Sequence, residues 1–352
     1  MSFPVHRWLG WLLVGAIAIT FGRLIFAEFV SWDDPLTVAA NPRMLPPTAG
    51  AVAGYWRLFP TPAAGEMRVI NHESGLWIPL TYTIWSGLAA LAQVGDGVQA
   101  PRELNPWVFH AANVAIHAGT SLLVLRLLGT LGLAPLPALI GAMVFALHPL
   151  QVEAVAWVSG LKDLLAGLFS IGCILLFLMQ AAGSLPRALA RMSWWLALVL
   201  MVAAMLCKPS AVATPLILLV MDRLLLRRPT GLTTLATLPF FAAAVPFAVI
   251  ARLSQSADLW APPLWQRPLI AADALAFYAA KLIWPSCLSV DHGRSPGMIL
   301  QTGEIYWTWI VPVLIGMAAV WVWRAGERRP LVGLLIFVAA LLPVLGFVPF
   351  IF

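Results

Sequence analysis

Residues 162–182 read KDLLAGLFSIGCILLFLMQAA, and this stretch decides the fold. No charged residue lies between Asp163 and Arg187, so the segment is long and apolar enough to cross a bilayer, which takes ~20 apolar residues. The rest of the chain has the same character, since 61% of its 352 residues are hydrophobic and only 10% are charged. A soluble domain carries about 25% charged residues. The composition therefore predicts an all-α membrane protein that crosses the bilayer several times.

Further apolar runs predict about nine transmembrane helices. The expected ranges are 8–28, 107–128, 134–149, 162–182, 193–207, 210–226, 232–250, 304–323 and 330–351. Arginines gather at every second junction between these ranges and mark the cytoplasmic side by the positive-inside rule. The first range has no clear small-residue cleavage site, so we expect an uncleaved span and a multi-pass protein of the inner (plasma) membrane.

This orientation places two long segments, 29–106 and 251–303, on the extracytoplasmic side of a single domain that covers 1–352. Within the second, the apolar stretch 268–287 is expected to be an interfacial or re-entrant helix, because a tenth span would put Arg324 on the wrong side. The net charge of +6 includes no run of more than two adjacent basic residues. Nucleic acid is therefore not expected as a partner.

The first candidate site is the pair Asp33 and Asp34, which follows the first expected span directly. Two adjacent carboxylates at a membrane boundary are costly unless they are solvated, paired or bound to a metal. Either one is suited to act as a general base, and the alternative is a solvated loop that turns at Pro35. A divalent cation between the two acids stays open, since the sequence shows no convincing third ligand.

The second candidate is a polar stripe on the expected span 107–128. His110, Asn113 and His117 are spaced so that they share one face of a helix. Polar stripes in membrane helices face the protein interior or a wet cavity, so these residues are candidates for binding a substrate. The alternative is hydrogen bonding between helices. Two histidines two turns apart are too few for a metal site.

The densest polar cluster surrounds the start of the span 162–182. Its candidate substrate-binding residues are His148, Glu153, Trp157, Lys162, Asp163 and Lys208. Lys162 and Lys208 are expected at the same outer end as the acids, where lysine is a good point-charge partner for phosphate. The alternative is that each lysine only extends its ammonium toward the interface.

A last candidate group, Asp291, His292 and Arg294, lies in the second outer segment. Arg294 could bind a phosphate through both arms of its guanidinium, and the alternative is an ordinary polar turn at Gly293. The cysteines are widely spaced and predict neither a metal nor a redox site.

Six motifs taken in order resemble one family. They are Trp32–Pro35, Trp77–Thr81, Phe109–His117, His148–Trp157, Lys162–Asp163 and Lys208–Pro209. From about residue 28 onward, the chain resembles the membrane part of the transmembrane, tetratricopeptide-containing O-mannosyltransferases and their bacterial homologues, which belong to the GT-C superfamily of membrane glycosyltransferases. The resemblance implies a GT-C fold, with Asp33 and Asp34 as the acidic motif of the active site. It also implies a polyprenyl-phosphate sugar donor, most often of mannose.

The chain departs from the family pattern in three places. Gln151 stands where many bacterial relatives have a histidine, and Leu161 stands where an arginine is usual. Relatives continue past the final apolar run, often into tetratricopeptide repeats that this sequence lacks. The chain is therefore expected to be truncated, and a partner chain could supply the further segments.

These observations predict a glycosyltransferase that moves a monosaccharide from a polyprenyl-phosphate donor in the lipid to a hydroxyl of an exported protein or glycan acceptor. We expect inversion at the anomeric carbon and an active site on the extracytoplasmic side. Two alternatives use the same residues without chemistry. One is a flippase or transporter of lipid-linked sugars, and the other is an inactive fragment that scaffolds a partner chain.

Overall fold

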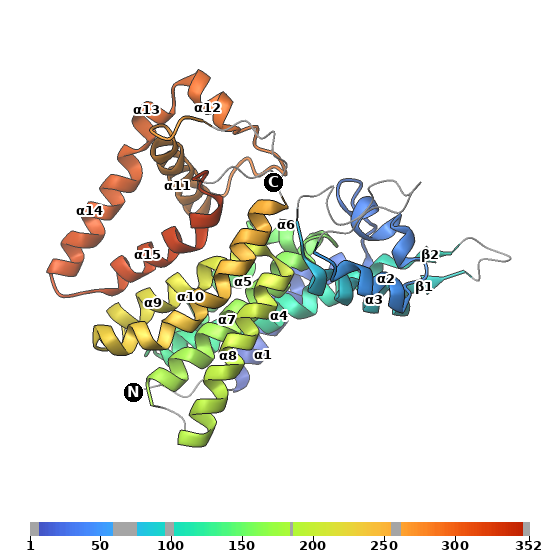
Figure 1. Ribbon diagram of the computed structural model, residues 1–352, viewed down its shortest axis with the longest axis horizontal. Helices are drawn as coiled ribbons and strands as arrows, with labels where there is room; N and C mark the ends of the chain where they lie inside the picture. Colours follow the sequence, from blue (N-terminus) through green and yellow to red (C-terminus); the bar gives the residue numbers. More distant parts are fainter. Residues whose placement is uncertain (1–6, 59–75, 96–101, 184–185, 255–261, 348–352) are drawn as a thin grey trace. The chain divides into compact units, whose positions relative to one another are not determined.

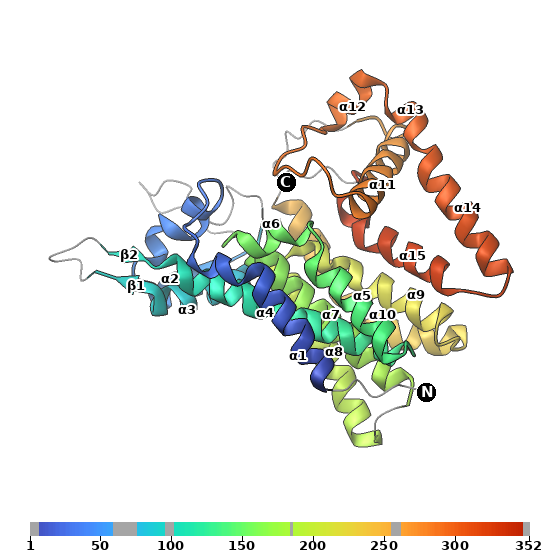
Figure 2. The same ribbon diagram turned by 180° about the vertical axis from the view of Figure 1, so that it is seen from behind.

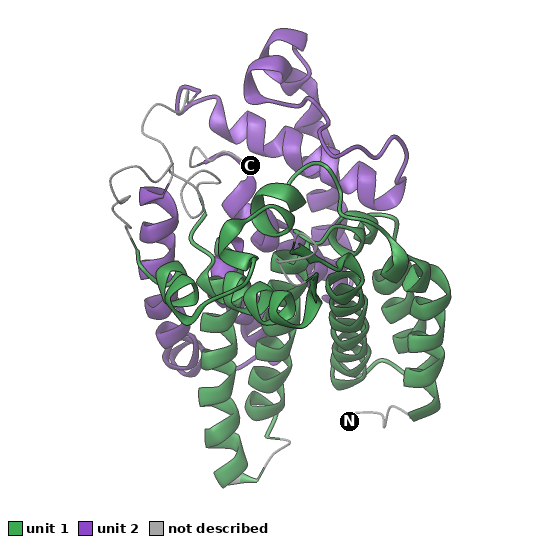
Figure 3. Cartoon of the chain, turned by 90° about the vertical axis from the view of Figure 1, so that its right-hand side faces the viewer, with its two compact units in different colours: residues 1–209 green, residues 210–352 purple. Residues whose placement is uncertain are grey.

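The structure is a computed structural model that describes residues 7–58, 76–95, 102–183, 186–254 and 262–347. This part of the chain is almost entirely helical, apart from a short antiparallel pair of strands, β1 (Gln93–Val94) and β2 (Glu103–Leu104). The chain divides into two compact units, residues 1–209 and 210–352 (Figure 3). That division leaves the expectation of one domain over 1–352 untested, since two units can belong to one domain.

The all-α polytopic membrane fold is confirmed. Six helices in the described ranges are long and apolar enough to cross a membrane: Arg7–Phe26, Pro106–Thr130, Leu161–Ala181, Ala188–Cys207, Thr230–Leu253 and Ile305–Arg324. The three other expected ranges also hold helices, but these are shorter: Pro135–Leu147, Thr214–Leu224 and Arg329–Leu341. The stretch 268–287 forms a 17-residue helix, Arg267–Ile283. Its position at the membrane interface stays a prediction.

The first unit is built around one long helix, α4 (Pro106–Thr130). It contacts α1 (Arg7–Phe21), α5 (Pro135–Leu147) and α7 (Leu161–Ala181), and α7 pairs with α8 (Arg187–Cys207) (Figures 1 and 2). The α1 side of this core uses residues four apart, and α5 presents small side chains at the same spacing. They are Leu9, Leu13 and Ile17 on α1, and Ala138, Ala142 and Ala146 on α5. Small residues let helices approach closely where lipid offers no hydrophobic drive.

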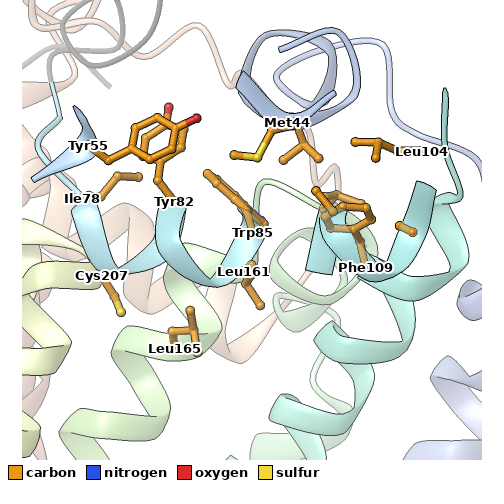
Figure 4. Packing of buried hydrophobic residues seen from close by; sticks show 14 of the residues in the cluster. Met44, Tyr55, Ile78, Tyr82, Trp85, Leu104, Phe109, Leu161, Leu165 and Cys207 are labelled. Atoms are coloured by element: carbon orange, nitrogen blue, oxygen red, sulfur yellow. The ribbon is translucent and has the colours of Figure 1, made fainter. Parts of the chain in front are cut away.

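At one end of this bundle, residues of the segment 29–106 pack onto the helices. This segment is called the first outer segment, and 251–303 the second, after the side of the membrane that the sequence predicts for them. Its short elements are η2 (Pro35–Ala39), η3 (Pro42–Met44), α2 (Ala49–Tyr55) and α3 (Pro79–Ala92), whereas η1 (Gly22–Phe26) continues the first span. Aromatic rings of α2 and α3 lie in one buried cluster with Leu161 and Leu165 of α7 and Cys207 at the end of α8 (Figure 4). The Thr81 hydroxyl of α3 also donates to the carbonyl of Cys207 at 3.1 Å. The outer segment is therefore attached to the bundle by packing and by a buried hydrogen bond.

The second unit has its own helical packing. Its helices are α9 (Thr214–Leu224), α10 (Thr230–Leu253), α11 (Arg267–Ile283), α12 (Pro296–Thr302), α13 (Ile305–Thr308), α14 (Ile310–Arg324) and α15 (Arg329–Leu341). In this unit α9 contacts α10 and α15, and α14 contacts α15 and α11. Ile270 of α11 packs on Ile299 and Ile305, so the second outer segment also has a small apolar core.

A tight turn joins α6 (Gln151–Ala156) to α7 and requires glycine. A Cβ atom on Gly160 would lie only 2.3 Å from the carbonyl oxygen of Ala154, although the backbone of Gly160 itself is ordinary (φ −66°, ψ −12°). The glycine is needed for space rather than for conformation. The turn sets the direction in which Lys162, two residues later, enters the outer end of the bundle.

We predict that Gly160→Ala destabilises the protein by about 1–3 kcal/mol, because the new methyl group overlaps backbone that cannot move freely. Gly167→Ala is the matched control, since a Cβ atom at this α7 position meets nothing within 4 Å. It should keep or slightly raise stability, as alanine is the better helix former. Thermal unfolding of the purified proteins in detergent compares the two. Equal midpoints would show that the turn can relax around a side chain.

Candidate active site

The two adjacent acids occupy opposite environments. Asp34 is 0% exposed, and its carboxylate accepts the backbone N–H of Val30 at 2.9 Å and that of Ser159 at 2.8 Å. The Asp33 side chain is 40% exposed and faces Lys162, with 4.0 Å between Oδ2 and Nζ. A buried carboxylate is tolerated when it accepts hydrogen bonds in this way. Asp34 is therefore a structural link between two loops, whereas Asp33 has the solvent-accessible carboxylate.

The local sequence explains this difference. Pro35 is the first residue of η2, a π-helical turn, and the side chain of Asp34 makes no hydrogen bond to that turn. Thr37 instead anchors the backbone of Asp33, because both its N–H and its hydroxyl donate to the Asp33 carbonyl, at 3.0 and 2.9 Å. With its main chain held, Asp33 presents its carboxylate at a fixed place.

The two lysines lie at the same end of the first unit as the acids, as the sequence predicts. Lys162 is in the first turn of α7, 19% exposed and opposite Asp33. Lys208 ends α8 in an extended conformation, and its ammonium forms a hydrogen-bonded ion pair with Asp163. Each lysine thus has an acidic neighbour. A lysine that only extends its ammonium toward the interface would not require one, so the structure favours a role for both lysines within the polar cluster.

The polar stripe of α4 contacts backbone. His110 bonds the carbonyl of Glu28 at 3.2 Å and His117 bonds that of Ala146 at 2.8 Å, so each ring carries its proton on Nε2, because a carbonyl only accepts. Asn113 donates to the carbonyls of Trp157 and Val155. All three side chains are buried. This geometry supports the alternative of hydrogen bonding between segments, and binding of a substrate by the stripe stays a prediction.

The segment between α5 and α7 holds the next three candidates. His148 ends α5, and its Nδ1 accepts the N–H of Leu150 at 3.2 Å. Glu153 is exposed in the first turn of α6, and Trp157, which ends that helix, is partly buried. Because α6 contacts both α4 and α7, these residues belong to the same end of the bundle as Asp33.

In the second unit, Arg294 belongs to an ion-pair network that the sequence did not reveal. Arg294 donates to both oxygens of Asp273, at 3.0 and 2.8 Å, and pairs with Glu304 at 2.8 Å. Burial opposes the charge of Arg294, but these bonds outweigh it and raise the pKa of the guanidinium. Both arms of Arg294 are thus engaged by carboxylates, which makes it a poorer phosphate ligand than the sequence predicts. Asp273 could have been noticed as the one acid in the apolar stretch 268–287.

The rest of this group forms a polar turn. Asp291 accepts the N–H of Gly293 at 2.7 Å, and the ring of His292 packs edge-on against Phe277 with centroids 5.1 Å apart. Across the described ranges, no three His, Cys, Asp or Glu side chains gather as metal ligands. Both oxygens of Asp34 accept backbone N–H groups, and a divalent cation between Asp33 and Asp34 stays a prediction.

Two tyrosines of the outer segment extend the site beyond the sequence candidates. Tyr82 is buried, and burial raises the pKa of its hydroxyl, with Tyr55 and the charge of Asp33 adding to the effect. Tyr55 stacks on Tyr82 with ring centroids 4.5 Å apart. No sequence signal marks either tyrosine, since their stacking arises only when α2 and α3 pack together.

Comparison with known proteins supports the resemblance. The chain is 28% identical to human Protein O-mannosyl-transferase TMTC1 over 221 residues, which cover 60% of this chain and 23% of that protein. It is 31% identical to human TMTC4 over 31% of this chain and 17% of the relative. It is 33% identical to Tmtc2 of Drosophila melanogaster over 33% of this chain and 13% of the relative. The chain thus resembles this family but spans less than a quarter of these relatives' length. No family model and no solved structure matches it.

We predict that Asp34→Asn lowers the free energy of unfolding by about 2–4 kcal/mol, because an amide nitrogen then faces a buried backbone N–H. Asp33→Asn is the matched control and should unfold near the wild-type temperature, since that side chain is exposed and bonds no described N–H. Thermal unfolding in detergent tests the pair. The division of roles between the acids fails if Asp33→Asn is as destabilising as Asp34→Asn.

Proposed function

We propose that this chain is a membrane glycosyltransferase that moves a mannose-like monosaccharide from a polyprenyl-phosphate donor to a hydroxyl of an exported protein or other acceptor. The observation that carries the proposal is the exposed carboxylate of Asp33, fixed opposite Lys162 at the end of a membrane-helix bundle. Buried Asp34 holds the two loops that bring them together. The matched relatives are named protein O-mannosyl-transferases, which supports this class of reaction.

Asp33 would act as the general base. It takes the proton of the acceptor hydroxyl as that oxygen attacks the anomeric carbon of the donor. The bond from the anomeric carbon to the phosphate oxygen breaks, and its electron pair leaves with the phosphate, so this oxygen needs no proton. A positioned base contributes ~10²–10⁴-fold in rate. A single displacement of this kind inverts the anomeric centre.

The 4.0 Å separation between Asp33 and Lys162 suits this role. It is longer than a direct hydrogen bond, so a substrate hydroxyl or a water molecule can bind between the two groups. Lys162 then favours the ionised form of Asp33, and it stabilises charge on the leaving phosphate together with Lys208. A neutral His148 ring, which accepts at Nδ1, carries its proton on Nε2 and can donate a hydrogen bond.

The competing function is transport of the same lipid-linked sugar without chemistry. The charged candidates of the first unit gather at one end of its helices. There Lys162 of α7 faces Asp33, and Asp163 of α7 pairs with Lys208. A transporter that alternates its access needs polar groups reachable from both faces. This asymmetry favours transfer over transport. A scaffold for a partner chain, or a need for further segments from one, remains an alternative that the activity assay below addresses.

We predict that Asp33→Asn lowers sugar transfer from polyprenyl-phosphate mannose about 10²–10⁴-fold, because the base is lost while the shape of the site is kept. Glu103→Gln, an exposed acid of the same outer segment, is the control and should transfer at the wild-type rate. The assay measures labelled sugar on an acceptor in membranes. Equal rates for Asp33→Asn and the control would rule out the base. Wild-type protein that only equilibrates intact donor across vesicles would point to transport instead.

The extracytoplasmic position of the site can be tested through the cysteines. Cys287 is exposed in the second outer segment, while Cys173 and Cys207 are buried. We predict that a membrane-impermeant maleimide labels Cys287 from outside and that Cys287→Ser removes the label. Adding Trp32→Cys to Cys287→Ser should restore it, because Trp32 is 60% exposed beside Asp33. Labelling of either position only after the membrane is permeabilised would place that segment in the cytoplasm.

A further inference from the structure

Arg43 is a cation that the proposed mechanism does not use. It lies in η3 and is partly buried, and none of the ion pairs among the described residues includes it. By contrast, Lys162, Lys208 and Arg294 each face a carboxylate. The Arg43 guanidinium instead lies over the ring of Tyr55, 5.9 Å from its centroid. A partly desolvated guanidinium that pairs with none of the described carboxylates is suited to bind an anion.

Packing holds Arg43 against two aromatic rings of α2 and α3. Arg43, Tyr55 and Tyr82 form a ladder in which the guanidinium covers Tyr55 and the two rings stack at 15° (Figure 4 shows the ring pair). Both rings are buried. The far end of this ladder is Tyr82 of α3. The ladder therefore holds the guanidinium of Arg43 against the docked helix α3.

Hydrogen bonds to the backbone connect Arg43 with the candidate base. The Asn41 side chain accepts the N–H of Arg43 at 3.0 Å and donates to the carbonyl of Thr37 at 3.1 Å. Thr37 is the residue whose N–H and hydroxyl both bond the carbonyl of Asp33. Arg43 thus belongs to the same hydrogen-bonded turn as the base, and its position does not depend on a long loop.

The charge balance of the site favours an additional cation such as Arg43. Asp33, Asp34 and Asp163 outnumber Lys162 and Lys208, so this cluster has a net negative charge when all five are ionised. The proposed donor is a phosphodiester that is itself anionic, and the phosphate gains further charge as it leaves. Binding and departure of that phosphate call for a cation that no carboxylate already neutralises.

We propose that Arg43 is a further substrate-binding residue whose guanidinium holds the phosphate of the lipid-linked donor, with Tyr55 and Tyr82 as positioning residues. This inference rests on the proposed function, because it assigns a ligand within the same site. The planar fork of arginine matches phosphate through two parallel hydrogen bonds. The aromatic ladder restricts the rotation of the guanidinium, which lowers the entropy lost when it binds.

The test compares two lipid probes that differ only in the phosphate, farnesyl phosphate and farnesol, on the full chain in detergent. Arg43→Gln, which keeps much of the packing, and Arg43→Ala should both weaken farnesyl phosphate tenfold or more and leave farnesol unchanged. Arg43→Lys should lie between them and wild type, since the charge remains while the fork is lost. Arg57→Ala, an exposed arginine just past α2, is the control and should bind both probes like wild type.

The outcomes separate this inference from the proposed function. Asp33→Asn should bind farnesyl phosphate at least as tightly as wild type, because one negative charge is removed, while it loses transfer, so binding and chemistry are read independently. The role of Arg43 is overturned if Arg43→Gln retains wild-type preference for farnesyl phosphate, even if sugar transfer proceeds as proposed. It is also overturned if wild type does not prefer the phosphate to the alcohol. Thermal unfolding midpoints for every variant show whether a loss of binding reflects a loss of fold.

Discussion

The arrangement of the site depends on one buried carboxylate. Asp34 accepts the N–H of Val30, four residues before it, and that of Ser159, 125 residues after it. Removing an ionised carboxylate from water is unfavourable by several kcal/mol unless such bonds replace its hydration. The same bonds fix the segment after α1 against the turn that starts α7. The distance between Asp33 and Lys162 is set by this link, so the second acid of the pair determines where the first one can work.

The sequence predicted the helices and the end of the bundle where the charges meet, because the bilayer allows few alternatives. An apolar run of sufficient length must form a helix there, and alternate helix ends must lie on one side. The sequence did not show which acid is buried, because that depends on Ser159, a partner far along the chain. The sequence also suggested Arg294 as a phosphate ligand, because no pattern in the residues near 294 indicates that Asp273 and Glu304 are its partners.

The α4 stripe illustrates a second limit of sequence reasoning. His110, Asn113 and His117 bond main-chain carbonyls, which every residue possesses and no sequence pattern marks. Such bonds tolerate changes in the partner's side chain. Gln151, which departs from the family pattern, likewise donates to the carbonyl of Phe145 at 3.2 Å. Gln151 therefore makes a structural hydrogen bond in this block.

The docking of α3 onto the ends of α7 and α8 has a consequence for biogenesis. Thr81 bonds the carbonyl of Cys207, 126 residues later in the chain, and Tyr82 and Trp85 pack in one cluster with Leu161 and Cys207. During synthesis, α3 leaves the ribosome well before its docking surface exists. Its aromatic side chains cannot pack in their final positions until the α7–α8 hairpin has been synthesised and inserted. A ribosome stalled before residue 207 would thus carry an outer segment that cannot yet adopt its final packing.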